Sequence, residues 1–410
     1  MDPSPLSKNN RKTLIANLRL NAAGFGSICL ALGIGSLMAG HASPAVAGGY
    51  AYVMALVGIG MIAGMPGLQN AIAGAAARNE KEGCRAALRA SFLSSLAGSA
   101  LLALSAALPV ETGPDARTAI LIAAACLPFY GASQWYYGWR IGKEDIRGAT
   151  RLWAAGTAGT VAAQAAALLW APSVSALTAA SLLPHILIEG WASKKLYDRL
   201  PKRNSGEKAS PMRFGVAITA ADALASLAFY ADTLVMTWHG NMAAVATYAF
   251  AKLIPENAKE AVKNAGLASF NAMATATPEE LVARFPKFSM NVIWCLFGGV
   301  CAYMLAAPGI FRIFFPKYME AVPYSQVLAL SAMGFGNHPA YKLFQARKYT
   351  EGIIRLQAAS AGMQITAAIM LIPAYGIWGA VIGRTISRIG SLLYSMRLAR
   401  KFIAQAKNRI

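Results

Sequence analysis

The feature that most constrains this chain is its recurring apolar stretches of about 20 residues, such as Asn17 to Ala39 and Phe288 to Ala307. A helix of that length rises 1.5 Å per residue and crosses a hydrocarbon core about 30 Å thick. Hydrophobic residues make up 56% of the 410 residues and charged residues only 14%. Soluble globular proteins average about 25% charged residues. The sequence therefore predicts an all-α polytopic membrane protein and excludes an ordinary soluble globule.

Charged connections and Gly or Pro breaks divide the apolar sequence into about twelve expected transmembrane helices. We expect these helices over residues 17–39, 47–75, 88–109, 117–138, 151–170, 176–197, 212–238, 242–266, 288–310, 321–345, 353–373 and 376–398.

A connection rich in charge and turn formers, Arg199 to Pro211, separates the first six expected helices from the last six. We therefore expect an N-terminal six-helix lobe over 1–198, a cytoplasmic interlobe linker over 199–211 and a C-terminal six-helix lobe over 212–410. The last lobe ends in a basic cytoplasmic tail.

The net charge of +20 comes from 38 Lys and Arg against 18 Asp and Glu. In a soluble protein this excess would suggest nucleic-acid binding, but here the basic residues gather in alternate connections, as the positive-inside rule requires. The exceptions are Arg117, Arg312 and Lys317 in expected outside connections and Lys252, Arg384 and Arg388 within expected helices. The pattern predicts cytoplasmic termini and no nucleic-acid partner.

Acidic residues at membrane depth are the first functional clue. The first five expected helices contain none, whereas the later ones contain Glu189, Asp222, Asp232 and Glu256. Ionisable groups at the bilayer centre cost about 2.5–3.5 kcal/mol each on insertion scales, so they usually face a protein interior or a water-filled cavity. We treat all four as candidates for coupling transport to an ion, with Asp222 leading because it lies near mid-depth. Structural roles stay open, because Lys252 can neutralise Glu256 or Asp222, and Asp232 lies near the outer end.

Two arginines in the last expected helix are the second clue. Arg384 and Arg388 are four residues apart and so share one helix face near mid-bilayer depth. Guanidinium groups bind phosphate through paired N–H donors, so the pair suggests a phosphate-binding site. Arg388 can alternatively extend toward the cytoplasmic headgroups.

Small polar residues in the early helices, including Asn21 and Gln69, could line a sugar path or form interhelical hydrogen bonds. His185 and His338 lack an identifiable carboxylate partner in the sequence, which favours a structural role for both. Neither a metal-ligand spacing nor a nucleophile with a base occurs in the sequence. We therefore expect no metal, no cofactor and no enzymatic activity.

Certain segments resemble a known family. The segment IPAYGIWGAVIGRTIS, Ile372 to Ser387, resembles the yGi.GA signature of the polysaccharide repeat-unit flippases, a family of the MOP superfamily. Tyr230 to Leu253 resembles that family's helix with an early Asp, a short turn and a Tyr that enters the next helix. The QARK turn from Gln345 to Lys348 also fits.

The resemblance implies a MATE-like fold of two six-helix lobes around a central cavity, in the inner membrane of a bacterium. It implies alternating access that moves an undecaprenyl-diphosphate-linked oligosaccharide, such as an O-antigen, capsule or exopolysaccharide repeat unit, from the cytoplasmic to the periplasmic leaflet. Arg384, Arg388 and Lys252 would supply the basic path for the diphosphate. Implied partners are this lipid-linked substrate, membrane lipids, a proton or sodium ion, and a polysaccharide polymerase with its chain-length regulator.

Two other functions remain open. A multidrug exporter of the same superfamily would bind organic cations, but we would expect it to carry an acidic ion site in the first lobe. A membrane glycan polymerase or ligase would be an enzyme with a large periplasmic loop containing Arg and His. Every outside connection expected here is short.

Overall fold

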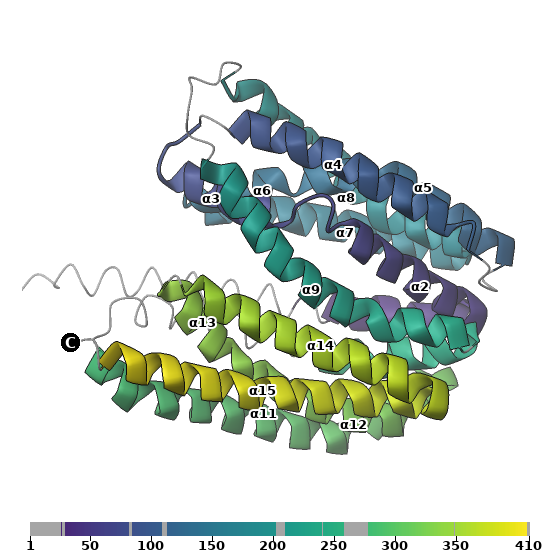
Figure 1. The fold of residues 1–410 in the computed structure, drawn as a ribbon. Helices are drawn as coiled ribbons and strands as arrows, with labels where there is room; N and C mark the ends of the chain where they lie inside the picture. The colour runs from purple at the N-terminus through teal and green to yellow at the C-terminus, as the bar shows by residue number, and fades with distance from the viewer. Residues whose placement is uncertain are drawn as a thin grey trace, which may run out of the picture. The chain divides into compact units, whose positions relative to one another are not determined.

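The structure is a computed structural model that describes residues 26, 29–81, 84–108, 113–201, 210–239, 241–257, 278–347 and 349–407. Helices account for almost all of these residues, and no strand occurs among them (Figure 1). Within the described ranges, seven helical segments have the length and hydropathy of membrane spans: Cys84–Ser105, Asp115–Gly142, Arg147–Trp170, Val174–Arg199, Ile218–His239, Glu279–Phe314 and Thr350–Tyr375. Shorter apolar helices cover Cys29–His41 and Pro44–Gly60. The prediction of an all-α polytopic membrane protein is confirmed.

Contacts divide the chain into two compact units. We call Leu37–Ala246 the N-terminal unit, and Thr247–Ile410 together with Met1–Ser36 the C-terminal unit. The helix Ser210–His239, which we expected to open the second lobe, packs within the N-terminal unit. The units are defined by contacts and the lobes by membrane topology, so the lobes over 1–198 and 212–410 stay a prediction.

The N-terminal unit contains eight labelled helices. They are α2 (Pro44–Gly60), α3 (Gly67–Ala77), α4 (Cys84–Ser105), α5 (Gly113–Ser133), α6 (Trp135–Gly142), α7 (Ile146–Trp170), α8 (Val174–Arg199) and α9 (Ser210–His239). Helix α5 packs against α4 and α8, and α3 packs against α6 and α9. Gly67 permits the contact between α3 and α9, because a Cβ atom there would lie 2.4 Å from the carbonyl oxygen of Gly215.

The single helix expected over 47–75 is wrong, because the structure breaks it between α2 and α3. Pro66 disfavours the helical conformation at the preceding residue, and Met65 has a φ of 56°. Two serines of α4 compensate for the lost helical hydrogen bonds. Ser91 Oγ donates to the carbonyl of Gly64 at 2.5 Å, and Ser94 Oγ donates to that of Ala63 at 2.6 Å.

The C-terminal unit is built from α11 (Pro278–Phe314), η1 (Pro316–Tyr318), α12 (Ala321–Ser331), η2 (Ala332–Asn337), α13 (His338–Ala346), α14 (Thr350–Tyr375) and α15 (Ile377–Lys407). Residues 247–257, within a helix over 242–257, also belong to it. The uninterrupted helix expected over 321–345 is wrong, since the 3-10 segment η2 interrupts it. Gly334 in η2 lies so close to α15 that its Cβ would be 2.5 Å from Cβ of Arg388.

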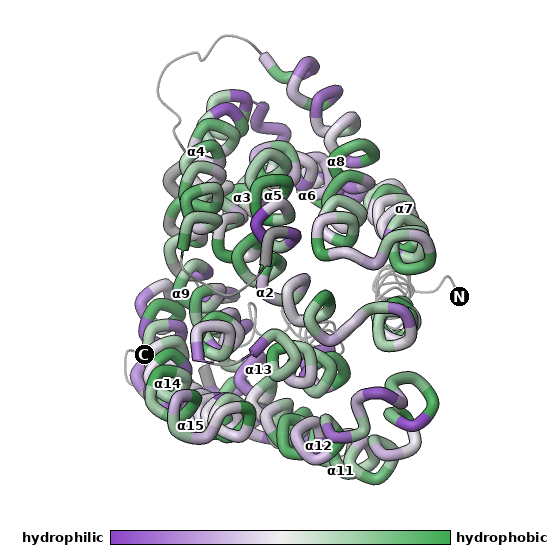
Figure 2. The backbone as a smooth tube through the Cα atoms, turned by 90° about the vertical axis from the view of Figure 1, so that its right-hand side faces the viewer, coloured by the Kyte–Doolittle hydropathy of each residue, from purple (hydrophilic) through white to green (hydrophobic). Residues whose placement is uncertain are grey.

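The YGIWGA segment forms the turn from α14 into α15. Gly376 has a φ of 56°, a conformation that residues with side chains rarely adopt. A Cβ at Gly379 would lie 2.0 Å from the carbonyl oxygen of Leu371, so only glycine allows the two helices to approach this closely. The turn therefore fixes how α15 packs along α14, and with it the positions of the arginines further along α15. Figure 2 shows the hydropathy of both units along the backbone.

Candidate functional site

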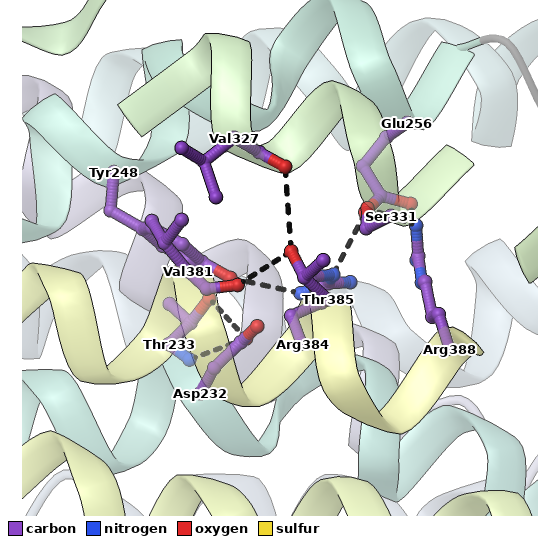
Figure 3. Close-up of polar contacts among 10 residues, drawn as sticks. All are labelled: Asp232, Thr233, Tyr248, Glu256, Val327, Ser331, Val381, Arg384, Thr385 and Arg388. Atoms are coloured by element: carbon purple, nitrogen blue, oxygen red, sulfur yellow. Dashed lines mark hydrogen bonds and ion pairs between the residues drawn. The ribbon is translucent and has the colours of Figure 1, made fainter. Parts of the chain in front are cut away.

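Helix α15 carries Arg384 and Arg388 one turn apart inside the C-terminal unit. Polar side chains between them are satisfied locally: Thr385 Oγ1 donates to the carbonyl of Val381 at 2.8 Å, and Ser387 Oγ donates to that of Gly383 at 2.6 Å. Thr385 also lies 3.4 Å from the carbonyl oxygen of Val327 in α12 (Figure 3). Both hydroxyls are therefore bonded to backbone carbonyls of α15 itself. The partners of the two arginine side chains lie on other elements.

One carboxylate binds both arginines. Glu256 Oε1 lies 2.9 Å from Nε of Arg384, and its Oε2 lies 2.8 Å from Nη2 of Arg388 (Figure 3). Glu256 comes from the helix over 242–257, far from α15 in the sequence. The shared face predicted for the arginines is thus the face that meets Glu256.

Arg384 is further held by Tyr248. Its Nη1 donates to the Tyr248 hydroxyl at 3.1 Å, and both residues are almost completely buried. Tyr248 also contacts Lys252, whose ammonium lies 4.9 Å from the centre of the tyrosine ring. The ring attracts the cation through its electron-rich face. Tyr248, which the sequence analysis did not select as a site residue, therefore connects two of the three predicted substrate-binding cations.

Arg388 has partners on α12 and η2. Its Nη1 donates to Ser331 Oγ at 3.3 Å, and its guanidinium carbon lies 4.7 Å from the centre of the Phe335 ring. The close approach of Gly334 to α15 brings Phe335 to this position. Arg388 is therefore held inside the unit rather than extended toward headgroups, the alternative considered from the sequence.

The cluster combines three cations, Arg384, Arg388 and Lys252, with the carboxylate of Glu256. The Arg384 side chain is 0% exposed, that of Arg388 12% and that of Glu256 14%. Removing one partner of a buried ion pair leaves an uncompensated charge and costs about 3–5 kcal/mol. The sequence analysis considered Lys252 as the partner of Glu256, whereas the structure shows two arginines bound to its oxygens. Since two guanidinium groups meet on one carboxylate, such a cluster suits an anion that can replace the carboxylate.

The other predicted ion-coupling residues lie in the N-terminal unit. Asp232 is 2% exposed, and its Oδ1 accepts a hydrogen bond of 2.7 Å from the backbone N–H of Thr233. Asp222 is half-buried in α9. Glu189 is 6% exposed in α8, where its Oε1 lies 3.0 Å from Nδ1 of His185. Their roles in coupling stay predictions.

The inference that His185 lacks a carboxylate partner is wrong, because Glu189 lies four residues later on the same helix face. The i to i+4 spacing was the signal that could have found it. A second buried polar group lies between α2, α7 and α8: Gln164 Nε2 donates to the Tyr50 hydroxyl at 3.0 Å and to Ser181 Oγ at 2.8 Å. The N-terminal unit therefore contains buried polar groups in addition to its predicted acids.

The two small polar candidates have different outcomes. Asn21 lies outside the described residues. Gln69 lies in α3 of the N-terminal unit, where it lines a cavity of about 10 Å³ with Gly131, Gln134 and neighbouring residues. Its expected place along a sugar path stays a prediction. Within the described ranges, no group of three or more His, Cys, Asp or Glu side chains is arranged to hold a metal ion.

Comparison with solved structures identifies the fold. An inward-facing MATE multidrug transporter of the MOP superfamily has a TM-score of 0.74 and 17% identity, covering 93% of this chain and 96% of that one. An outward-facing MATE transporter has a TM-score of 0.67 and 18% identity, covering 97% and 96%. A MOP transporter from Pyrococcus furiosus has a TM-score of 0.63 and 17% identity, covering 96% of each chain.

No protein-family profile and no curated protein sequence matches the chain. The polysaccharide-flippase resemblance of the sequence is therefore supported at the level of the MOP fold, and the substrate is not identified by similarity. The chain is a multi-pass membrane protein with the fold of MATE transporters.

Proposed function

We propose that this chain is a transporter that moves an undecaprenyl-diphosphate-linked oligosaccharide from the cytoplasmic to the periplasmic leaflet of a bacterial inner membrane by alternating access. The observation that carries the proposal is the buried cluster of Arg384, Arg388 and Lys252 around Glu256 within a transporter fold. The oligosaccharide would be an O-antigen, capsule or exopolysaccharide repeat unit. A polymerase and its chain-length regulator would act on the product.

The chemistry of the substrate matches the cluster. A diphosphate and its sugars cannot cross hydrocarbon unaided, because each buried charge needs a compensating partner. Two guanidinium groups on successive turns offer several N–H donors to the phosphate oxygens, and Lys252 adds a third positive charge. The polyprenyl chain can meanwhile remain in the lipid.

Glu256 then acts as an internal substitute for the diphosphate. Its two oxygens hold one arginine each, at 2.9 and 2.8 Å, so both guanidinium groups stay in place without substrate. An arriving diphosphate carries more negative charge than one carboxylate and competes with it for the same two guanidinium groups. Because Arg384 is fully buried here, the substrate gains access only when the site opens, as alternating access provides.

An organic-cation exporter is the alternative within this fold. The two guanidinium groups that meet on Glu256 disfavour it, since their N–H donors suit an anion rather than a cation. The P. furiosus transporter is described as having a binding pocket of reverse polarity that suggests a different function. This supports a non-multidrug substrate for a chain with the same fold. The transporter neighbours also favour transport over the polymerase or ligase alternative.

Coupling to a proton or sodium ion would use one of the buried acids. Glu189 has a titratable neighbour in His185, and Asp222 and Asp232 lie in one helix, α9. We retain Asp222 as the leading candidate because of its expected depth. Glu256 is the fourth candidate, and release of its arginines would be the event that changes its charge state.

Export complementation tests the proposal. We expect Arg384→Ala to reduce glycan export at least about tenfold and Arg384→Lys to keep part of it, because lysine retains charge without the two-pronged donor. Arg284→Ala is the matched control, since Arg284 is 79% exposed and pairs only with Glu280 among the ion pairs described for it. Normal export by Arg384→Ala at equal membrane level would assign a structural role to this arginine and remove the basis of the proposal.

A double variant separates folding from transport. Arg384→Gln with Glu256→Gln removes both charges of the buried pair, and the charge left without its ion-pair partner is that of Arg388, whose side chain is 12% exposed. We expect this variant to reach the membrane and still fail to export. Export restored by the second substitution would contradict a substrate contact at Arg384.

A further inference from the structure

A cavity of the N-terminal unit lies at the C-terminal end of α8. Its volume is about 720 Å³. It is lined by Asn79, Lys81, Tyr136, Trp139, Arg140, Lys143, Asp145, Leu152, Trp191, Ala192, Lys195, Leu196, Arg199 and Leu200. Nothing in the proposed transport cycle uses these residues.

Three cations of this cavity each lie over the ring of the aromatic residue four positions earlier in the sequence. The guanidinium carbon of Arg140 is 4.7 Å from the centre of the Tyr136 ring, and Lys195 Nζ is 3.5 Å from that of Trp191. Lys143 Nζ is 5.7 Å from the centre of the Trp139 ring. The rings hold Lys143 and Lys195 in place without neutralising their charge, whereas Arg140 is also paired with the carboxylate of Asp145.

The lining therefore retains its positive charge. Lys81, Arg140, Lys143, Lys195 and Arg199 are its basic residues, and Asp145 is its one acid. Asp145 is already used twice, since Oδ2 lies 2.6 Å from Nη1 of Arg140 and Oδ1 accepts the backbone N–H of Gly148 at the start of α7. Lys143 is positioned by a hydrogen bond to Asn79. Most of the positive charge is thus available to a ligand.

The charge pattern also predicts where the cavity lies relative to the membrane. Its residues come from three connections that the charge pattern assigns to the cytoplasmic side, around residues 78–89, 140–151 and 194–213. The structure brings the described residues of these segments that line the cavity, within 79–81, 136–152 and 191–200, to one end of the N-terminal unit. Figure 2 shows hydrophilic residues at that end of α8, next to turns of hydrophobic residues in the same helix. Tryptophan and tyrosine at such a boundary are typical of the headgroup region.

We propose that this cavity binds the phosphate headgroup of an anionic phospholipid from the cytoplasmic leaflet. The basic side chains contact the phosphate, the aromatic rings lie at headgroup depth, and Leu152 contacts the start of the acyl chains. The site is separate from the Glu256 cluster and does not depend on what the protein transports. A bound lipid here would join the ends of α6 and α8 through one shared anion.

Titration of the full chain in neutral detergent tests this site. Short-chain phosphatidylglycerol is the probe, with phosphatidylcholine and inorganic phosphate as comparison ligands. We expect Lys143→Gln with Lys195→Gln to weaken phosphatidylglycerol binding at least about tenfold, since each cation near a headgroup contributes about 1 kcal/mol. The matched control is Arg147→Gln with Lys194→Gln, which removes the same charge from exposed positions of the same region that do not line the cavity.

Three results would overturn the proposal. Equal weakening by both double variants would indicate general surface attraction, and equal binding of phosphatidylcholine would remove the role of net charge. Inorganic phosphate binding as tightly as the lipid would assign the cavity to a free anion. Lys195 is exposed, so Lys195→Gln alone provides a variant that folds if the double variant does not.

Discussion

The Nε atom of Arg384 lies 2.9 Å from Oε1 of Glu256, so a guanidinium with no exposed surface depends on a carboxylate from a different helix. Neither charge is tolerable alone at this depth, and each therefore fixes the position of the other. The same carboxylate reaches Arg388 through its second oxygen. This shared use of one anion is the basis of the first prediction.

Glu256→Gln should lower the free energy of unfolding by about 3 kcal/mol, because it leaves two neighbouring arginines without their anion. Denaturation in detergent measures the change. Glu280→Gln is the comparison, since Glu280 forms an exposed i to i+4 pair with Arg284 worth about 0.3–0.5 kcal/mol. Similar losses of unfolding free energy for the two variants would show that the buried ion pair stabilises the protein no more than the exposed one does.

Tyr248→Phe should reduce export while keeping the aromatic ring beneath Lys252. The substitution removes the hydroxyl that accepts from Arg384 Nη1 at 3.1 Å, and a hydrogen bond to a charged group contributes about 1.5–3 kcal/mol. Tyr248→Leu, which also removes the ring, should export less than Tyr248→Phe. The order is measured by complementation at matched membrane levels, and equal export by wild type and both variants would exclude Tyr248 from the site.

Asp222→Asn should uncouple transport from an imposed proton or sodium gradient without preventing substrate binding. Flipping of a diphosphate-linked lipid in proteoliposomes, with and without the gradient, measures this. Asp115→Asn is a useful control, because Asp115 Oδ2 accepts from the backbone N–H of Val174 at 2.6 Å and serves the packing of α8. Unchanged gradient dependence in Asp222→Asn would transfer the role to Glu189, Asp232 or Glu256.

A cysteine introduced at Ser205 should be labelled only from the cytoplasmic side. The charge pattern assigns the whole connection Arg199 to Pro211 to that side. The experiment needs a background without the native cysteines at positions 29, 84, 126, 295 and 301. Labelling by an impermeant reagent in cells with an intact inner membrane would reverse the predicted topology.

Gly379→Ala should destabilise the protein, because its Cβ would lie 2.0 Å from the carbonyl oxygen of Leu371 and force α14 and α15 apart. We expect a loss of about 1–3 kcal/mol, as for other overpacked sites. Gly362→Ala in α14 is the matched control, since its Cβ would meet nothing within 4 Å and alanine favours a helix by about 1 kcal/mol. Thermal unfolding in detergent should therefore move in opposite directions for the two variants.

The sequence by itself determined the class of this protein. Apolar length, low charge and alternating basic connections are local properties, and they suffice for an all-α membrane protein. The same patterns selected Arg384, Arg388 and Glu256, because charges are rare and costly within apolar helices. The resemblance of the YGIWGA segment pointed to the superfamily whose fold the structure shows.

Hydropathy could not predict the helix breaks at Met65 and in η2, because they interrupt apolar sequence without changing its hydropathy. The serines of α4 and the close contact of Gly334 with α15 make those breaks tolerable.

Only the tertiary structure decided which charges compensate one another. The sequence offered Lys252 as the partner of Glu256, because residues four apart on one helix are neighbours. The structure gives Glu256 to Arg384 and Arg388, which are more than a hundred residues away in the chain. Such a pairing depends on how α15 packs against the helix over 242–257, and no local spacing encodes it. The basic cavity at the end of α8 likewise arises only when residues within 79–81, 136–152 and 191–200 fold to one end of the unit.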